Sequence, residues 1–84
     1  VSQPRPVFPY YARQRGIEGY VDLRFTVNAQ GAVETAEVLA AQPAGVFDNE
    51  ALRAIRRWRF QPGIRHGQPV AANMQIRIRF TLDQ

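Results

Sequence analysis

Apolar and polar residues alternate along two segments of the chain, and this alternation predicts β-strands. In Gly19–Asn28 the residues at positions 21, 23, 25 and 27 are apolar and those between them are mostly polar. Met74–Leu82 has the same period, with apolar residues at positions 74, 76, 78, 80 and 82. Each strand has one apolar face and one polar face. The sequence therefore predicts a sheet that is covered on one side and solvated on the other.

A third strand is predicted at Ala32–Ala41, directly after the turn sequence Asn28–Gly31. The glycine of this turn can adopt a positive φ, as a tight hairpin requires. Val33 is out of phase with the later apolar residues of the strand, and a β-bulge near Glu34–Thr35 restores the phase. These features predict an antiparallel hairpin.

Helical spacing predicts the main helix over Phe47–Arg59, where Phe47, Ala51, Ile55 and Trp58 form one apolar stripe. Acidic residues at its start and arginines at its end complement the helix dipole. A short helix is predicted at Tyr10–Arg15. A polar loop, Ile64–Ala72, joins the main helix to the last strand.

These elements, in the order α-β-β-α-β, predict an α+β fold. We expect a two-layer α/β sandwich, in which one main helix packs on one face of a three-stranded antiparallel sheet and a short helix precedes the first strand. The expected core includes Phe25, Phe47, Ile55, Trp58 and Phe60. Residues 1–9, with prolines at 4, 6 and 9, are typical of the end of a proline-rich linker, and residues 10–84 form the domain.

The stretch Ala54–Pro62 surrounds Trp58 with three arginines, which is compatible with an anion-binding surface. The alternative is a helix end whose tryptophan belongs to the core. Because Trp58 falls on the apolar stripe of the helix, we expect it to be buried, with its indole N–H bonded to a backbone carbonyl. The motif alone does not establish a binding site.

Composition argues against catalysis. The 84 residues carry a net charge of +4 and contain no cysteine and a single histidine, His66. No second histidine can pair a base with a nucleophile, and no glycine-rich phosphate loop is present. We therefore expect no enzyme activity, no metal site and no cofactor. No apolar run reaches the length of a membrane span.

Two binding functions remain. Arg24, Arg77 and Arg79 could share the polar face of the sheet with Tyr20, as in sheet-type RNA-binding proteins. No aromatic pair of that type is present and Asp22 interrupts the positive charge, so nucleic acid is not the expected partner. The alternative is a peptide: the last strand, if it lies at an edge, exposes unpaired backbone groups that can take an additional strand. Its arginines would guard that edge against aggregation or orient an acidic peptide.

Several motifs together resemble the C-terminal domain of the TonB energy-transducer family. They are Phe8-Pro9 near the start, Ile17-Glu18-Gly19 before the first strand, Gln30-Gly31 in the hairpin, Phe47 to Glu50 at the helix start, Arg56 to Pro62 at its end, and the terminal strand Ile76–Phe80. The resemblance covers nearly the whole chain. Phe8 departs from the family pattern, which has tyrosine there, and the loop containing His66–Val70 is similar to the TonB2-type or HasB-type branch.

The resemblance implies a periplasmic domain of a protein anchored in the inner membrane of a Gram-negative bacterium. Such a protein couples the ExbB–ExbD motor to TonB-dependent outer-membrane receptors for siderophore iron, haem or vitamin B12. A TolA-like envelope adaptor of the same fold, without transport coupling, is the alternative. Exposed edge strands also permit a homodimer by strand exchange.

The resemblance also implies which residues make contact. The receptor peptide would pair with the last strand, through Gln75, Ile76, Arg77, Ile78, Arg79, Phe80 and Thr81. A second group would lie near the receptor plug and comprises Arg5, Val7, Phe8, Pro9 and Arg13. Glu18 and Arg57 are expected to be structural.

Overall fold

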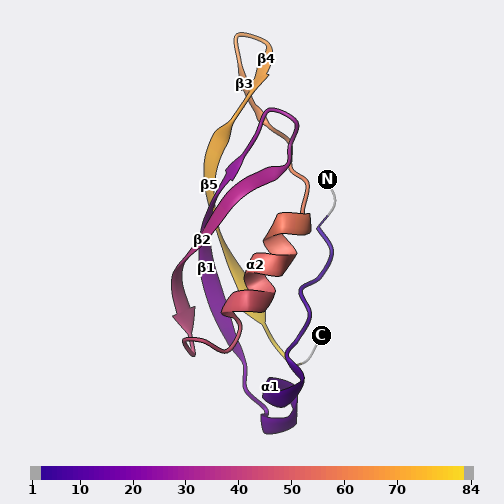
Figure 1. Ribbon diagram of the computed structural model, residues 1–84, viewed down its shortest axis with the longest axis vertical. Coiled ribbons are helices and arrows are strands. Elements are labelled where there is room, and N and C mark those ends of the chain that lie inside the picture. Colours follow the sequence, from indigo (N-terminus) through magenta and orange to yellow (C-terminus); the bar gives the residue numbers. More distant parts are fainter. Residues whose placement is uncertain (1–2, 83–84) are drawn as a thin grey trace.

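A computed structural model describes residues 3–82 and arranges them in two layers (Figure 1). The elements in chain order are α1 (Tyr10–Arg15), β1 (Gly19–Val27), β2 (Val33–Gln42), α2 (Asp48–Arg57), β3 (Gly63–Arg65), β4 (Gln68–Val70) and β5 (Ala72–Phe80). The predicted α+β class and the α-β-β-α-β order are confirmed, with the short pair β3–β4 inserted before the last strand. The molecule is elongated, with extents of 50 × 22 × 16 Å.

The main sheet has the strand order β2-β1-β5, and both pairings are antiparallel. The predicted bulge is confirmed: Thr26 lies opposite Thr35 while Val27 lies opposite Val33, which leaves Glu34 as the additional residue. A second irregularity, which the sequence did not predict, leaves Leu39 without a partner on β1. The pairing of β1 with β5 is regular over nine residues, from Gly19 opposite Phe80 to Val27 opposite Ala72.

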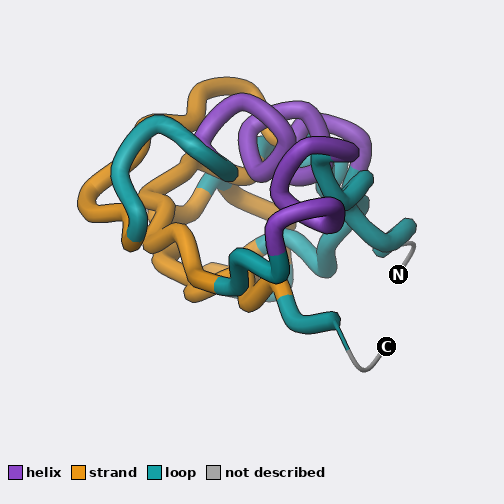
Figure 2. The backbone as a smooth tube through the Cα atoms, turned by 90° about the horizontal axis from the view of Figure 1, so that it is seen from below, coloured by secondary structure: helices purple, strands orange, loops and turns teal. Residues whose placement is uncertain are grey.

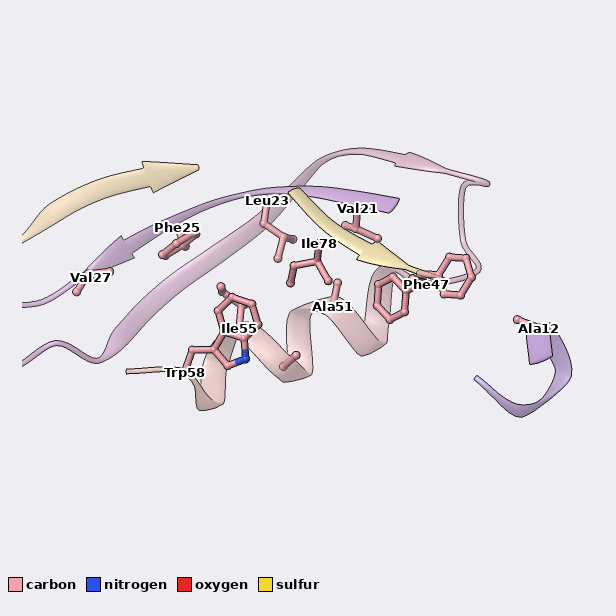
Figure 3. Packing of buried hydrophobic residues seen from close by; sticks show 12 residues of the cluster. Ala12, Val21, Leu23, Phe25, Val27, Phe47, Ala51, Ile55, Trp58 and Ile78 are labelled. Atoms are coloured by element: carbon pink, nitrogen blue, oxygen red, sulfur yellow. The ribbon is translucent and has the colours of Figure 1, made fainter. Parts of the chain in front are cut away.

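The helix α2 covers the apolar face of this sheet, and both helices lie on one side of the strands (Figure 2). The buried cluster between the layers contains Val21, Leu23, Phe25, Val27, Phe47, Ala51, Ala54, Ile55, Trp58, Ile78 and Phe80 (Figure 3). Four of the five predicted core residues belong to it. The fifth, Phe60, is half-buried and packs against Phe25 at a ring distance of 5.1 Å.

The environment of Trp58 resolves the question raised by its three arginines. Trp58 is 7% exposed, and its indole nitrogen donates a hydrogen bond to the carbonyl of Pro4 at 2.8 Å. Arg56, Arg57 and Arg59 are all exposed. Trp58 is therefore a core residue whose N–H binds a backbone carbonyl, as predicted.

Pro4, whose carbonyl binds the indole of Trp58, belongs to the segment 4–9, which packs along the domain. Phe8 contacts Phe47 edge-to-face at a ring distance of 5.4 Å and Phe80 at 6.2 Å. These contacts join residues before α1 to the start of α2 and to the end of β5. The division of the chain into a linker at 1–9 and a domain at 10–84 stays a prediction.

The segment that the sequence analysis assigned to a loop instead forms the hairpin β3–β4. His66 and Gly67 have φ values of 51° and 76°, and they connect Arg65 to Gln68, which are paired. A two-residue turn with two positive φ values matches the twist of an antiparallel pair. Histidine at the first of these positions is not a typical turn residue, so the local sequence did not reveal the hairpin.

The exposure of Met74 also differs from the expectation, since the alternation places Met74 on the apolar face with Ile76, Ile78 and Phe80. It lies opposite Phe25 on that face but is 37% exposed. The reason is the position of α2, which packs mainly against β2 and less against β1. The first half of β5 thus has little cover from the helix.

The turn at Gly31 gives a direct test of this packing. Gly31 has φ of 86°, its carbonyl accepts a hydrogen bond from Phe60 N–H, and an added Cβ would collide with the carbonyl oxygen of Phe60. We expect Gly31→Ala to lower the free energy of unfolding by more than about 2 kcal/mol, because backbone strain and steric conflict add. Urea unfolding followed by circular dichroism measures this loss.

Gly16→Ala is the matched control. Gly16 has a similar φ of 69°, but an added Cβ there meets nothing within 4 Å. Only the cost of the left-handed conformation, about 1–2 kcal/mol, should remain. Equal losses in the two variants would show that the close approach of the Phe60 carbonyl to Gly31 adds nothing to the cost of the substitution.

Candidate functional site

The outer edge of β5 is the first feature of the candidate site. β5 pairs with β1 on one side, and no strand among residues 3–82 pairs with its other side. Because α2 lies toward β2, the helix does not cover this edge. A regular nine-residue strand with one open side presents unpaired N–H and C=O groups in a single row.

The other edge of the sheet is built differently. β2 carries both irregularities of the sheet, with the additional residues Glu34 and Leu39, and it lies beside α2. Each bulge interrupts the spacing of the backbone groups that an added strand would need. Of the two edges, only that of β5 offers a continuous ladder.

The structure places most of the predicted peptide-binding residues in β5. Gln75, Ile76, Arg77, Ile78, Arg79 and Phe80 lie within the strand, whereas Thr81 follows its end. Ile78 and Phe80 are buried in the core, and Gln75, Arg77 and Arg79 are exposed on the polar face. A partner at this edge would therefore meet the backbone of β5 and the side chains of its polar face.

The residues predicted to lie near a receptor plug follow the segment before α1 rather than forming one cluster: Arg5 and Val7 line a pocket with residues of α2, and Phe8 contacts the end of β5. Arg5 and Val7 are exposed, Phe8 and Pro9 are half-buried, and the guanidinium carbon of Arg13 lies 4.9 Å from the centre of the Phe8 ring. Phe8 in turn packs against Phe80 of β5. The structure thus brings Phe8 and Arg13 to the C-terminal end of β5 and places Arg5 and Val7 along α2, while the role of all five residues in binding stays a prediction.

The polar face of the sheet is crossed by two ion pairs. Arg77 donates to both carboxylate oxygens of Asp22, at 2.7 and 3.0 Å, and its guanidinium carbon lies 3.9 Å from the centre of the Tyr20 ring. Arg24 pairs with Glu37 on β2. Two of the three arginines considered for nucleic-acid binding are thus already paired with carboxylates, and the face of Tyr20 is occupied. This arrangement disfavours a phosphate-binding surface.

The pair Asp22–Arg77 has electrostatic consequences. The hydrogen bond from Arg77 is the main cause that lowers the pKa of Asp22 below its ordinary value of 3.8, and the positive charges of Arg77 and Arg79 lower it further. The same hydrogen bond raises the pKa of Arg77. Both groups therefore stay charged at neutral pH.

Two contacts at this site depend on residues far apart in sequence. Glu18 accepts a hydrogen bond from the backbone N–H of Leu82 at 2.7 Å, which ties the chain after β5 to the start of β1. Glu37 pairs with Arg24 because the register between the two bulges of β2 places these residues opposite each other. The only sequence signal for the Arg24–Glu37 pair was the presence of opposite charges on the two strands. Which charges face each other depends on the register between β1 and β2, and the sequence does not give this register.

Residues 3–82 contain no group of three or more His, Cys, Asp or Glu side chains that could hold a metal ion. No helix among them is long and apolar enough to cross a membrane.

The pair Asp22–Arg77 predicts a pH-dependent contribution to stability. A carboxyl group whose pKa is lowered by folding stabilises the folded state above its unfolded pKa, and this contribution disappears as the pH falls through the lowered value. We expect Asp22→Asn to be less stable than the native chain at neutral pH, with the difference shrinking below about pH 4. Urea unfolding across this pH range measures it.

The control is Glu34→Gln, which removes the same charge from a bulge residue that has no ion pair among the described residues. A deficit of Asp22→Asn that stayed constant down to the acid range would contradict the assigned role of the pair.

Comparison with known proteins places this geometry in a family. The model for "Gram-negative bacterial TonB protein C-terminal" matches residues 4–82. The chain is 35% identical over 83 residues to the protein TonB of Escherichia coli and 40% identical over 82 residues to that of Vibrio cholerae, covering 99% and 98% of this chain. It covers 34% of each relative, so it spans about a third of their length.

Solved structures agree with this result. The solution NMR structure of the Pseudomonas aeruginosa TonB C-terminal domain superposes with a TM-score of 0.85 at 33% identity, over 100% of this chain and 85% of that one. The superposition covers the whole of this chain, and so includes the three-stranded sheet and both helices. The chain belongs to the family of TonB C-terminal domains.

Proposed function

We propose that this domain binds an extended segment of a TonB-dependent outer-membrane receptor, the TonB box, as a fourth strand on β5. In this proposal the domain is the periplasmic end of an energy transducer anchored in the inner membrane. The ExbB–ExbD motor would act on the part of the protein that this chain does not include. The receptors served would take up siderophore iron, haem or vitamin B12.

One observation carries the proposal: β5 is regular over nine residues and open on one side, whereas the opposite edge of the sheet carries two bulges. Strand addition requires a row of evenly spaced donors and acceptors. Only β5 has such a row. The additional strand would extend the order to β2-β1-β5-peptide.

The same geometry suits a mechanical role. The hydrogen bonds between an added strand and β5 would lie side by side, so a pull along the strand would load them together. β5 is itself held by nine pairs to β1 and by the Asp22–Arg77 ion pair across them. The residues before and within α1 would lie near the receptor plug: Phe8 and Arg13 at the end of β5, and with them Arg5, Val7 and Pro9.

The open edge would also permit two copies of the domain to pair by strand exchange. A peptide that occupies β5 would then compete with this homodimer. Dilution should favour the peptide complex, because self-association depends on protein concentration.

The test is an NMR titration of the labelled domain with peptides of about seven residues from the N-terminal segments of TonB-dependent receptors. We expect amide shift changes along Gln75–Phe80, and protection from hydrogen exchange at alternate residues of β5, because every second backbone unit of a strand faces the open edge. The amides of β2 should change little.

Peptides with methylated backbone nitrogens provide the control. Methylation at alternate positions removes either the N–H groups that face β5 or those that face solvent, while the side chains stay the same. One of the two patterns should abolish binding and the other should leave it nearly unchanged. Equal effects of both patterns, or shift changes centred on β2, would refute strand addition at β5.

A further inference from the structure

The polar face of the sheet consists of four rows of side chains that run across β2, β1 and β5. The pairing defines them as Thr35–Thr26–Asn73, Glu37–Arg24–Gln75, Ala40–Asp22–Arg77 and Gln42–Tyr20–Arg79. The first row is uncharged, and the second and third each contain one arginine and one carboxylate. The fourth row contains an arginine and no carboxylate.

The charges in the middle rows are engaged with one another. Arg24 pairs with Glu37, toward β2. Arg77 is turned toward β1, where it binds both oxygens of Asp22 and lies over the Tyr20 ring. Although Arg77 belongs to the edge strand, its guanidinium group is therefore directed away from the open edge.

Arg79, unlike Arg77, has no carboxylate partner in its row. It is exposed, its neighbours in the row are the uncharged Tyr20 and Gln42, and no ion pair joins it to a carboxylate among residues 3–82. The carboxylate of Glu18, which precedes β1, instead binds the N–H of Leu82. The row of Arg79 thus carries a positive charge and no carboxylate, and it lies on the strand with the open edge. Asp22 in the next row is close enough for the charge of Arg79 to lower its pKa, but both of its oxygens are bound by Arg77.

We propose that Arg79 is a specificity residue of the binding edge and that it selects a peptide with an acidic side chain in its row. This inference rests on the proposed strand addition. A strand added to β5 in either direction places one side chain beside Arg79, at a Cβ separation of about 5 Å. A carboxylate there completes the charge pairing of the face and fixes the register of the peptide.

The expected gain in affinity is small because Arg79 is exposed to solvent. Opposite charges in neighbouring strands at a solvated surface contribute about 0.2–1 kcal/mol, which corresponds to a change in affinity of about 1.4- to five-fold. The interaction should weaken with salt, since the Debye length falls from about 30 Å at 0.01 M to about 3 Å at 1 M. Backbone pairing supplies affinity, and Arg79 selects the register.

The experiment is an aspartate scan of an uncharged receptor-derived peptide that binds the domain. Asp is placed at each position in turn, and the Kd is measured by calorimetry at low salt with the native domain and with Arg79→Gln. We expect Asp at one position to tighten binding of the native domain by about 1.4- to five-fold. This gain should vanish in Arg79→Gln and shrink at high salt.

Arg56→Gln is the matched control. Arg56 is exposed on α2, in the other layer, and its substitution changes the net charge by the same amount. The position-specific gain should persist in this variant. Amide spectra of both variants check that the fold is intact, and contacts between the favoured Asp and Arg79 in the spectra of the complex check the placement.

The outcomes separate this inference from the function on which it rests. If the peptide binds β5 but the gain persists in Arg79→Gln, or no position shows a gain, Arg79 does not select an acid while strand addition stands. If the uncharged peptide and all its Asp variants fail to bind β5, both the function and the role of Arg79 are overturned.

Discussion

A length mismatch between the two layers determines much of this structure. A ten-residue helix is about 15 Å long, whereas a nine-residue strand extends about 30 Å. α2 therefore cannot cover the whole apolar face of β1. Phe8 packs where α2 begins and Phe60 packs beyond its end, so residues outside the regular elements cover what the helix leaves exposed.

The position of α2 across the sheet also distinguishes the two edges. α2 packs on β2 and, less, on β1, and β2 is the strand that carries the two bulges. β5 has little contact with the helix and keeps a regular register with β1 along its full length. The regular edge at β5 is thus also the edge that the helix leaves uncovered.

The sequence predicted most of the fold, because its strongest patterns are local. Alternation located β1 and β5, helical spacing located α2, and a phase error in the alternation located the bulge at Glu34. The hairpin β3–β4 escaped because its strands are three residues long and histidine occupies a turn position with positive φ. Trp58 was expected to bind a carbonyl, but its partner Pro4 lies in a segment that resembles a linker.

The candidate site was predictable only in part, because local patterns do not give the pairing between strands. The sequence shows a last strand that carries arginines, and in the sequence Arg77 and Arg79 look equivalent. Their difference depends on which residues of β1 and β2 share their rows, and the rows depend on two bulges, one of which, at Leu39, has no clear sequence signal. Non-local register, rather than residue type, distinguishes the two arginines.

An edge that is open for a partner is also open to a second copy of itself, and charge helps to separate the two cases. Among residues 3–82 of each copy, the row of Arg79 contains no carboxylate, so pairing two edges brings positive charge to positive charge. An acidic strand instead brings a carboxylate to the row that lacks one. The arginine that guards the edge against self-association is therefore the same group that favours an acidic partner.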